Sequence, residues 1–141
     1  MTAYVDASVL LRLALGQPDS LREWSKIDRG VSSALVTTES LRTLDRLRLR
    51  VRMGDSEVAQ RRAKILELIA SLEIVEVDAV VLDRAAQPMP TELGTLDAIH
   101  LATALLWNEM TAERLTMATH DTALAIASAA HGLPVIGANL E

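Results

Sequence analysis

Short apolar runs alternate along the chain with longer segments in which apolar residues recur every three to four positions. The runs at 2–5, 31–36, 73–77 and 114–119 have the length and composition of strands, and 133–137 is a fifth, shorter one. The longer segments have the periodicity of helices. Strands and helices that alternate in this order predict an α/β domain with a mostly parallel sheet of four to five strands.

Residues that cap or break helices mark the ends of the predicted helical segments. Gly16 and Pro18 end the first helix, Asp19 or Ser20 can cap the second, and Thr37 or Thr38 can cap the long helix that runs to Met53. Asp78 caps a later helix. The other boundaries place helices at 7–15, 20–28, 56–72, 79–87 and 121–130.

The segment 93–106, LGTLDAIHLATALL, combines a helical composition with one carboxylate. Its side chains are apolar nearly all the way round, which is typical of a helix inside a core. Asp97 shares a face with Leu101 and Ala104, with Thr95 as the expected N-cap. An ionised carboxylate in such a place is unfavourable unless something pairs with it.

Composition indicates one globular domain over residues 1–141. Half of the residues are apolar and 23% are charged, and the absence of cysteine excludes disulfides and cysteine-based zinc sites. Asp6 and Arg12 interrupt the first apolar run, so no signal peptide is visible. Glycine, proline and histidine break the longest uncharged stretch, 122–140, which excludes it as a membrane span. We expect a soluble, cytoplasmic protein.

The net charge of −5 argues against nucleic-acid binding, but the charges are unevenly distributed. Eight of the 14 Lys and Arg residues lie between Arg42 and Lys64. Arg42, Arg46, Arg48 and Arg50 could contact RNA or a protein partner, or they could form the solvated face of a helix that packs through its leucines. Arg42 is the best candidate because it lies one helical turn after Glu39.

Four acids come next to the predicted strand ends: Asp6, Glu39 and Asp121 follow strands, and Asp97 opens the buried helix. Parallel sheets bind ligands at the carboxyl ends of their strands, so these carboxylates are expected to converge. At 4 Å and an effective dielectric constant near 20, each ionised pair repels by about 4 kcal/mol. Such a cluster must take up protons or hold a cation, and oxygen ligands favour Mg²⁺ or Mn²⁺. The matching chemistry is phosphate-ester hydrolysis by a metal-activated water.

A purely structural interpretation of each acid stays open. Asp and Glu are favoured in the first turns of helices because they cap backbone N–H groups and interact with the helix dipole. His100 is interpreted in the same way, as a core or helix-surface residue rather than a base or a ligand. His120 is given no role.

Four motifs together resemble the PIN-domain ribonucleases, most closely the VapC toxins of bacterial toxin–antitoxin pairs. YVDASVLLRLAL resembles the opening strand and helix of that family, and TTESLRTL its second motif. LDAIHLATA is similar to the third motif, and MATHDTALAIASAAHGLPVI to the closing segment. The resemblance covers essentially the whole chain, in order.

This resemblance implies a three-layer α/β/α fold and a Mg²⁺- or Mn²⁺-dependent endoribonuclease. It implies that Asp6, Glu39, Asp97 and Asp121 are the catalytic and metal-site acids. Ser8 and Thr119 match supporting hydroxyls. RNA substrate, a VapB-type antitoxin and a homodimer are the implied partners. Two alternatives remain: a catalytically silent PIN-fold binding module, and a phosphoacceptor receiver domain, which the single acid after the first strand disfavours.

Overall fold

Five parallel strands form the centre of the molecule in the computed structural model, which describes residues 1–140. They are β1 (Thr2–Val5), β2 (Arg29–Ser33), β3 (Glu73–Val75), β4 (Thr116–Ala118) and β5 (Val135–Ile136). Their order in the sheet is β3-β2-β1-β4-β5, and every neighbouring pair is parallel. The predicted α/β class is therefore confirmed.

Helices cover both faces of this sheet. The helices are α1 (Ala7–Ala14), α2 (Leu35–Arg50), α3 (Asp55–Ala70), α4 (Ala79–Ala85), α5 (Thr95–Thr111) and α6 (Thr122–Ala130), with a short 3₁₀ helix, η1 (Arg22–Lys26). Ala3 and Val5 of β1 pack with α1, α2 and α3, whereas Tyr4 packs with α5 and α6 on the other face. This alternation follows from the two-residue period of a strand, and it confirms the three-layer arrangement.

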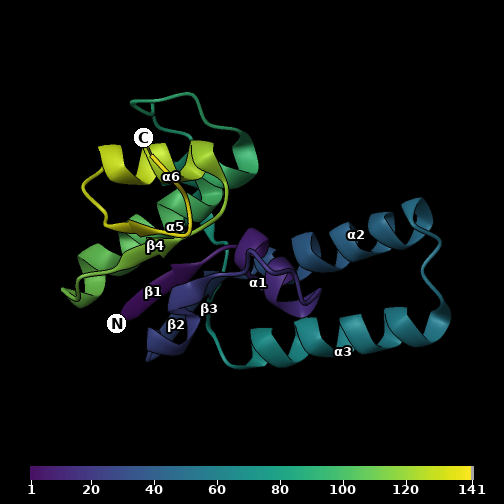
Figure 1. Cartoon of the computed structure of the whole chain (residues 1–141). Helices are drawn as coiled ribbons and strands as arrows, with labels where there is room; N and C mark the ends of the chain where they lie inside the picture. The colour runs from purple at the N-terminus through teal and green to yellow at the C-terminus, as the bar shows by residue number, and fades with distance from the viewer. Residues whose placement is uncertain (141) are drawn as a thin grey trace.

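Two long helices extend from one side of this body. Helices α2 and α3 lie side by side and form an arm that points away from the sheet, joined by a turn at its tip (Figure 1). Leu44 of α2 and Ile65, Leu68 and Ile69 of α3 belong to the core on this face of the sheet. The arm carries the arginine-rich segment.

The second predicted helix is wrong: residues 22–26 form only the short 3₁₀ helix η1. Leu21, Trp24 and Ile27 all contact the core, and their spacing of three residues matches the three residues per turn of a 3₁₀ helix. The apolar residues in this segment therefore recur every 3.0 residues, and not every 3.6 as in an α-helix.

The predicted caps of two helices are also wrong. Helix α2 begins at Leu35, so Thr37 and Thr38 lie inside it, and Ser33 ends β2 by accepting a hydrogen bond from the Leu35 N–H at 3.1 Å. Gly94 is the N-cap of α5 and Thr95 is its first helical residue. As a result, Glu39 and Asp97 lie one or more residues further into their helices than the pattern suggested.

No helix within residues 1–140 is both long enough and apolar enough to cross a membrane.

Candidate active site

Asp6 and Asp121 lie at the carboxyl ends of the adjacent strands β1 and β4. Each is the N-cap of the helix that follows: the Asp6 carboxylate accepts from the Val9 N–H at 3.3 Å, and that of Asp121 from the Leu124 N–H at 2.9 Å. Both carboxylates therefore have the structural role of helix caps that the sequence left open. Capping does not use all of the lone pairs of either carboxylate.

Asp6 is a buried carboxylate held by two hydroxyl groups. Its Oδ1 accepts from the Ser8 hydroxyl at 2.6 Å, and its Oδ2 accepts from the Thr119 hydroxyl at 2.5 Å. Burial raises the pKa of Asp6, while the hydrogen bonds from Ser8 and Thr119 oppose that rise. The two hydroxyls predicted to support the acids thus lie against one of them.

The same hydroxyls bind the segment that carries Asp121. Ser8 Oγ accepts from the His120 N–H, and Thr119 Oγ1 accepts from the Asp121 N–H, each at 2.9 Å. The ends of β1 and β4 are therefore joined through two side chains, Ser8 and Thr119.

Asp97 lies in the first turn of α5 and is half-buried. Desolvation, followed by the negative charge of Asp121, raises the pKa of Asp97 to about 6; His100 opposes this rise, and Asp6 and Glu39 add to it. Within residues 1–140, the Asp97 carboxylate has no hydrogen bond and no ion pair. The other three predicted acids are therefore within electrostatic range of Asp97.

Glu39 reaches this region from α2 and contacts His100 of α5. The carboxylate of Glu39 accepts a short hydrogen bond from His100 Nε2, and His100 Nδ1 lies 2.6 Å from the Tyr4 hydroxyl. His100 is a core residue, but one with polar partners on both ring nitrogens. The pattern held one signal for this: His100 follows Asp97 by three residues, which is one helical turn.

No Lys or Arg in the described part of the chain forms an ion pair with any of the four acids. Within residues 1–140, no three His, Asp or Glu side chains are arranged so that they could hold a metal ion as they stand. Hydroxyl groups hold the carboxylate of Asp6, and an imidazole holds that of Glu39.

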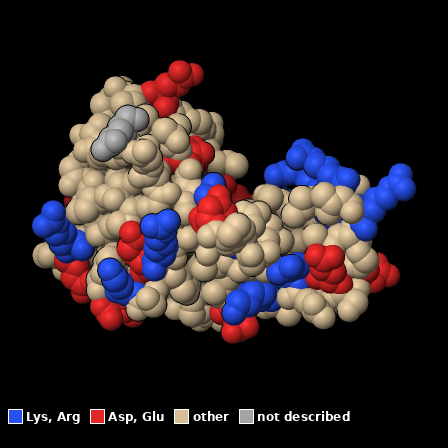
Figure 2. All heavy atoms as spheres, viewed as in Figure 1, with Lys and Arg blue, Asp and Glu red and all other residues tan. Residues whose placement is uncertain are grey.

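The predicted arginine contacts are on the exposed side of the arm. Arg42 and Arg48 both pair with Asp45, at 3.0 and 2.7 Å, and Arg46 donates to the Thr43 hydroxyl at 3.3 Å. Arg42 and Arg46 also line a hollow of about 250 Å³ together with Glu39, Leu35 and Leu96. Figure 2 shows basic side chains along the arm, with acidic ones among them, and acidic side chains beside a basic one where the arm meets the body. We call the region around Asp6, Glu39, Asp97 and Asp121 the acidic notch.

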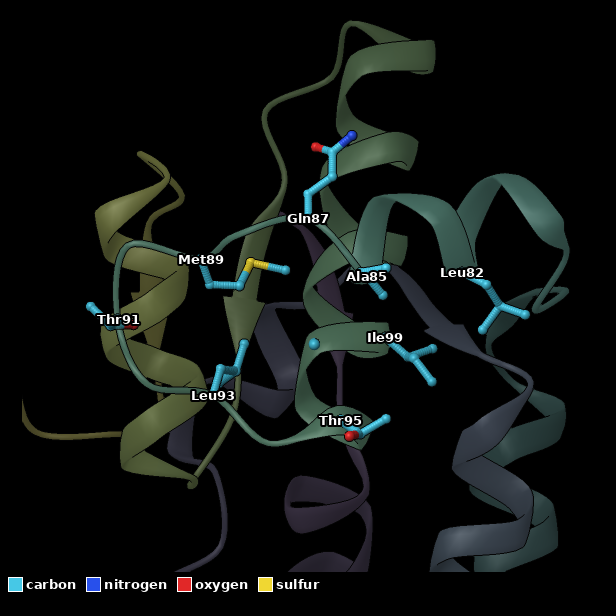
Figure 3. A pocket seen from close by; sticks show the side chains of 10 residues that line it. Leu82, Ala85, Gln87, Met89, Thr91, Leu93, Thr95 and Ile99 are labelled. Atoms are coloured by element: carbon cyan, nitrogen blue, oxygen red, sulfur yellow. The ribbon is translucent and has the colours of Figure 1, made fainter.

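A larger hollow of about 470 Å³ lies between α4, the loop 86–94 and the start of α5 (Figure 3). Leu82, Met89, Leu93 and Ile99 make its lining mainly apolar, and no acidic or basic side chain contributes to it. It therefore offers no carboxylate or imidazole for a metal ion and no positive charge for a phosphate.

The architecture and the four acids can now be compared with known proteins. A family model described as PIN domain matches residues 3–130. The chain belongs to the PIN domain family. The receiver-domain alternative is thereby set aside.

Relatives of this PIN domain include two curated ribonucleases of Mycobacterium tuberculosis. The chain is 42% identical to Ribonuclease VapC46 over 105 residues, which is 72% of each chain. It is 30% identical to Ribonuclease VapC47 over 103 residues, 72% of this chain and 73% of the relative.

Solved structures share the fold at low sequence identity. FitAcB from Neisseria gonorrhoeae matches with a TM-score of 0.66 at 18% identity, covering 95% of this chain and 96% of the other. A toxin–antitoxin complex from Klebsiella pneumoniae matches with a TM-score of 0.65 at 19% identity, covering 97% and 95%.

Proposed function

We propose that this PIN domain is the toxin of a toxin–antitoxin pair and an endoribonuclease that hydrolyses RNA with a divalent metal ion. The observation that carries the proposal is Asp97, a half-buried carboxylate that forms no hydrogen bond or ion pair within residues 1–140 and whose pKa is raised by the charges of Asp121, Asp6 and Glu39. Kinship with VapC ribonucleases supports the same activity.

The donor set fits Mg²⁺ or Mn²⁺. All four candidate ligands are carboxylates, which these hard cations prefer, and Mg²⁺ is usually held by one or two carboxylates with several waters rather than by a closed cage. An open group of acids is therefore the expected form of such a site. The raised pKa of Asp97 is the electrostatic counterpart: negative charge is in excess there, and a cation would relieve it.

In this mechanism Asp6, Glu39, Asp97 and Asp121 would hold the ion, directly or through water. When bound, the ion would activate a water molecule and offset negative charge on the scissile phosphate. Ser8 and Thr119 hold the Asp6 carboxylate in place, so its remaining lone pair has a fixed direction. No serine, cysteine or histidine nucleophile is needed.

The arginine face of the arm gives RNA a place to bind beside the acids. Arg42 and Arg46 share a hollow with Glu39, and Arg48 and Arg50 lie further along the same helix. Cationic side chains near the notch would offset the repulsion between RNA and a protein of net charge −5. The same face could instead receive an acidic segment of the antitoxin, which competition between antitoxin and RNA would reveal.

Two solved neighbours support an antitoxin as a partner: a toxin–antitoxin complex from Klebsiella pneumoniae, and VapBC2 from Rickettsia felis bound to a DNA fragment from its promoter. We extend this to a VapB-type antitoxin for the present chain. The proposed homodimer rests on the family resemblance alone.

The test is cleavage of structured RNA by the purified chain with Mn²⁺ or Mg²⁺, with and without EDTA. Cleavage should need the metal and should be lost in Asp97→Asn. Asp83→Asn, which neutralises an exposed acid on α4, is the matched control and should cleave like the wild type. Cleavage that persists in EDTA would overturn the metal mechanism, and a folded chain that cuts no RNA would favour the silent binding module.

A further inference from the structure

Three residues from three different elements form one hydrogen-bonded line that ends at the acidic notch. Tyr4 comes from β1, His100 from α5 and Glu39 from α2. The Tyr4 hydroxyl lies 2.6 Å from His100 Nδ1, and His100 Nε2 binds the Glu39 carboxylate. Tyr4 is fully buried and His100 is 1% exposed, so the line runs through the core and reaches solvent only at Glu39.

Both ring nitrogens of His100 have a polar partner in this line. A carboxylate only accepts, so the imidazole donates from Nε2 to Glu39. Nδ1 lies against the Tyr4 hydroxyl, which can donate to the bare nitrogen of a neutral ring or accept from the N–H of a protonated one. In either form, no polar atom of the imidazole is left without a partner.

This arrangement is more specific than core packing requires. An apolar side chain of the same volume would fill the position of His100 without placing polar atoms in the core, where each needs a partner. The polar atoms instead hold one carboxylate oxygen of Glu39. A Glu side chain has three rotatable torsions, and freezing them at the moment of ligand binding would weaken that binding.

We propose that His100, itself held by Tyr4, is a positioning residue that fixes the Glu39 carboxylate for the divalent ion. The inference rests on the proposed function, because it takes Glu39 as a metal-site acid. His100 also follows Asp97 by one turn of α5, so one helix both supplies an acid and orients a second from α2. Hydrogen bonds to ligating carboxylates from outside the coordination sphere typically change metal affinity or activity by about 10–100-fold.

The experiment compares four variants by Mn²⁺ binding to the purified full chain, followed by electron paramagnetic resonance of the free ion. His100→Phe keeps a ring and removes both hydrogen bonds; His100→Gln keeps an N–H donor for Glu39; Tyr4→Phe removes only the hydroxyl. Thr103→Val is the matched control, because Thr103 is also buried in α5 but its hydroxyl donates to the Ile99 carbonyl, outside the line.

We expect the Mn²⁺ dissociation constant to rise about 10–100-fold in His100→Phe and less in Tyr4→Phe. His100→Gln should recover part of the loss, and Thr103→Val should bind like the wild type. The rates of RNA cleavage should follow the same order at low Mn²⁺ and become equal at saturating Mn²⁺. The variants are expected to change the affinity for the ion and not the rate of the reaction once the ion is bound.

Two failures are distinguishable. A wild-type chain that binds no Mn²⁺ contradicts the proposed function itself. A wild-type chain that binds Mn²⁺, loses it in Asp97→Asn and retains it in His100→Phe overturns the positioning role alone. Should His100→Phe fail to fold by circular dichroism, Tyr4→Phe and His100→Gln decide, and wild-type affinity in both overturns the proposal.

Discussion

The Thr119 hydroxyl donates to Asp6 Oδ2 at 2.5 Å and accepts from the Asp121 N–H at 2.9 Å. One side chain at the end of β4 therefore ties together two acids that are far apart in the sequence. Because Asp6 is buried and forms no ion pair within residues 1–140, the hydrogen bond from this hydroxyl helps to offset the loss of water around the carboxylate.

We predict that Thr119→Val lowers both stability and cleavage. The variant keeps the shape of the side chain but leaves the Asp6 oxygen and the Asp121 N–H without their partner, which costs about 1–3 kcal/mol of unfolding free energy. Urea denaturation and RNA cleavage measure the two effects. Thr119→Ser, which restores the hydroxyl, should recover most of both. Equal stability of the Val and Ser variants would contradict the assignment.

Asp97 should make the metal-free protein less stable as the pH rises. Its pKa in the folded chain is about 6, above the ordinary value of 3.8, so between these pH values the folded state binds more protons than the unfolded state. Stability therefore falls as the pH rises through this window. Asp97→Asn removes that loss, and at pH 7 in EDTA it should gain about 1–2 kcal/mol, after allowance for solvent screening at a half-buried site.

Denaturation of wild type and Asp97→Asn at pH 4.5 and 7.5 in EDTA measures this difference. The gain should be small at the lower pH, where Asp97 is already protonated. Added Mn²⁺ should reverse the order at pH 7.5, because it stabilises the wild type and has one ligand fewer in the variant. A gain of equal size at both pH values would show that charge repulsion is not its cause.

The strand ends and the acids that follow them were predictable because both depend on local features. Asp6 comes directly after β1 and Asp121 three residues after the end of β4, and each caps the next helix, so one short motif fixes the strand, the cap and the place of the carboxylate. The parallel order of the sheet then brings the two side chains to the same edge. These steps need no knowledge of distant contacts.

The line from Tyr4 through His100 to Glu39 was not predictable in the same way. Its members lie 96 and 61 residues apart in the two contacts, and each has an ordinary local explanation. Only the packing of α2 and α5 against the sheet brings them together. The predicted start of α2 was wrong for a related reason. Val36 is buried in the core, and the helix begins at Leu35, before the two threonines that were predicted to cap it.

Gly137 lies against the backbone of Thr119, and we predict that Gly137→Ala damages the site. A Cβ atom there would lie 2.6 Å from the Thr119 carbonyl oxygen, and the backbone φ of +94° is unfavourable for alanine. Gly132→Ala is the matched control, since Gly132 has a φ of +84° with no atom within 4 Å of the added carbon.

Both variants should lose about 1 kcal/mol from the positive φ. Gly137→Ala should lose more, and it alone should weaken Mn²⁺ binding, because Thr119 must shift away from Asp6. Thermal denaturation and Mn²⁺ titration separate the two effects. Equal losses in the two glycine variants would mean that the close contact with Thr119 relaxes without disturbing the acids.

The arginines of α2 differ in how they are already paired, which makes RNA binding by this face testable. Arg42 and Arg48 share Asp45, so their charges are partly neutralised within the helix. Among residues 1–140, Arg46 has a hydroxyl as its only partner, and it lines the same hollow as Glu39. We predict that Arg46→Ala raises KM for RNA and leaves kcat nearly unchanged. The slope of log affinity against log salt should become shallower by about one for the lost phosphate contact.

Arg62→Ala is the matched control. Arg62 is an exposed residue of α3, so the variant removes the same charge away from that hollow and should leave KM unchanged. If both variants raised KM equally, the effect would come from net charge, and the face around Arg46 would not be a binding site for RNA.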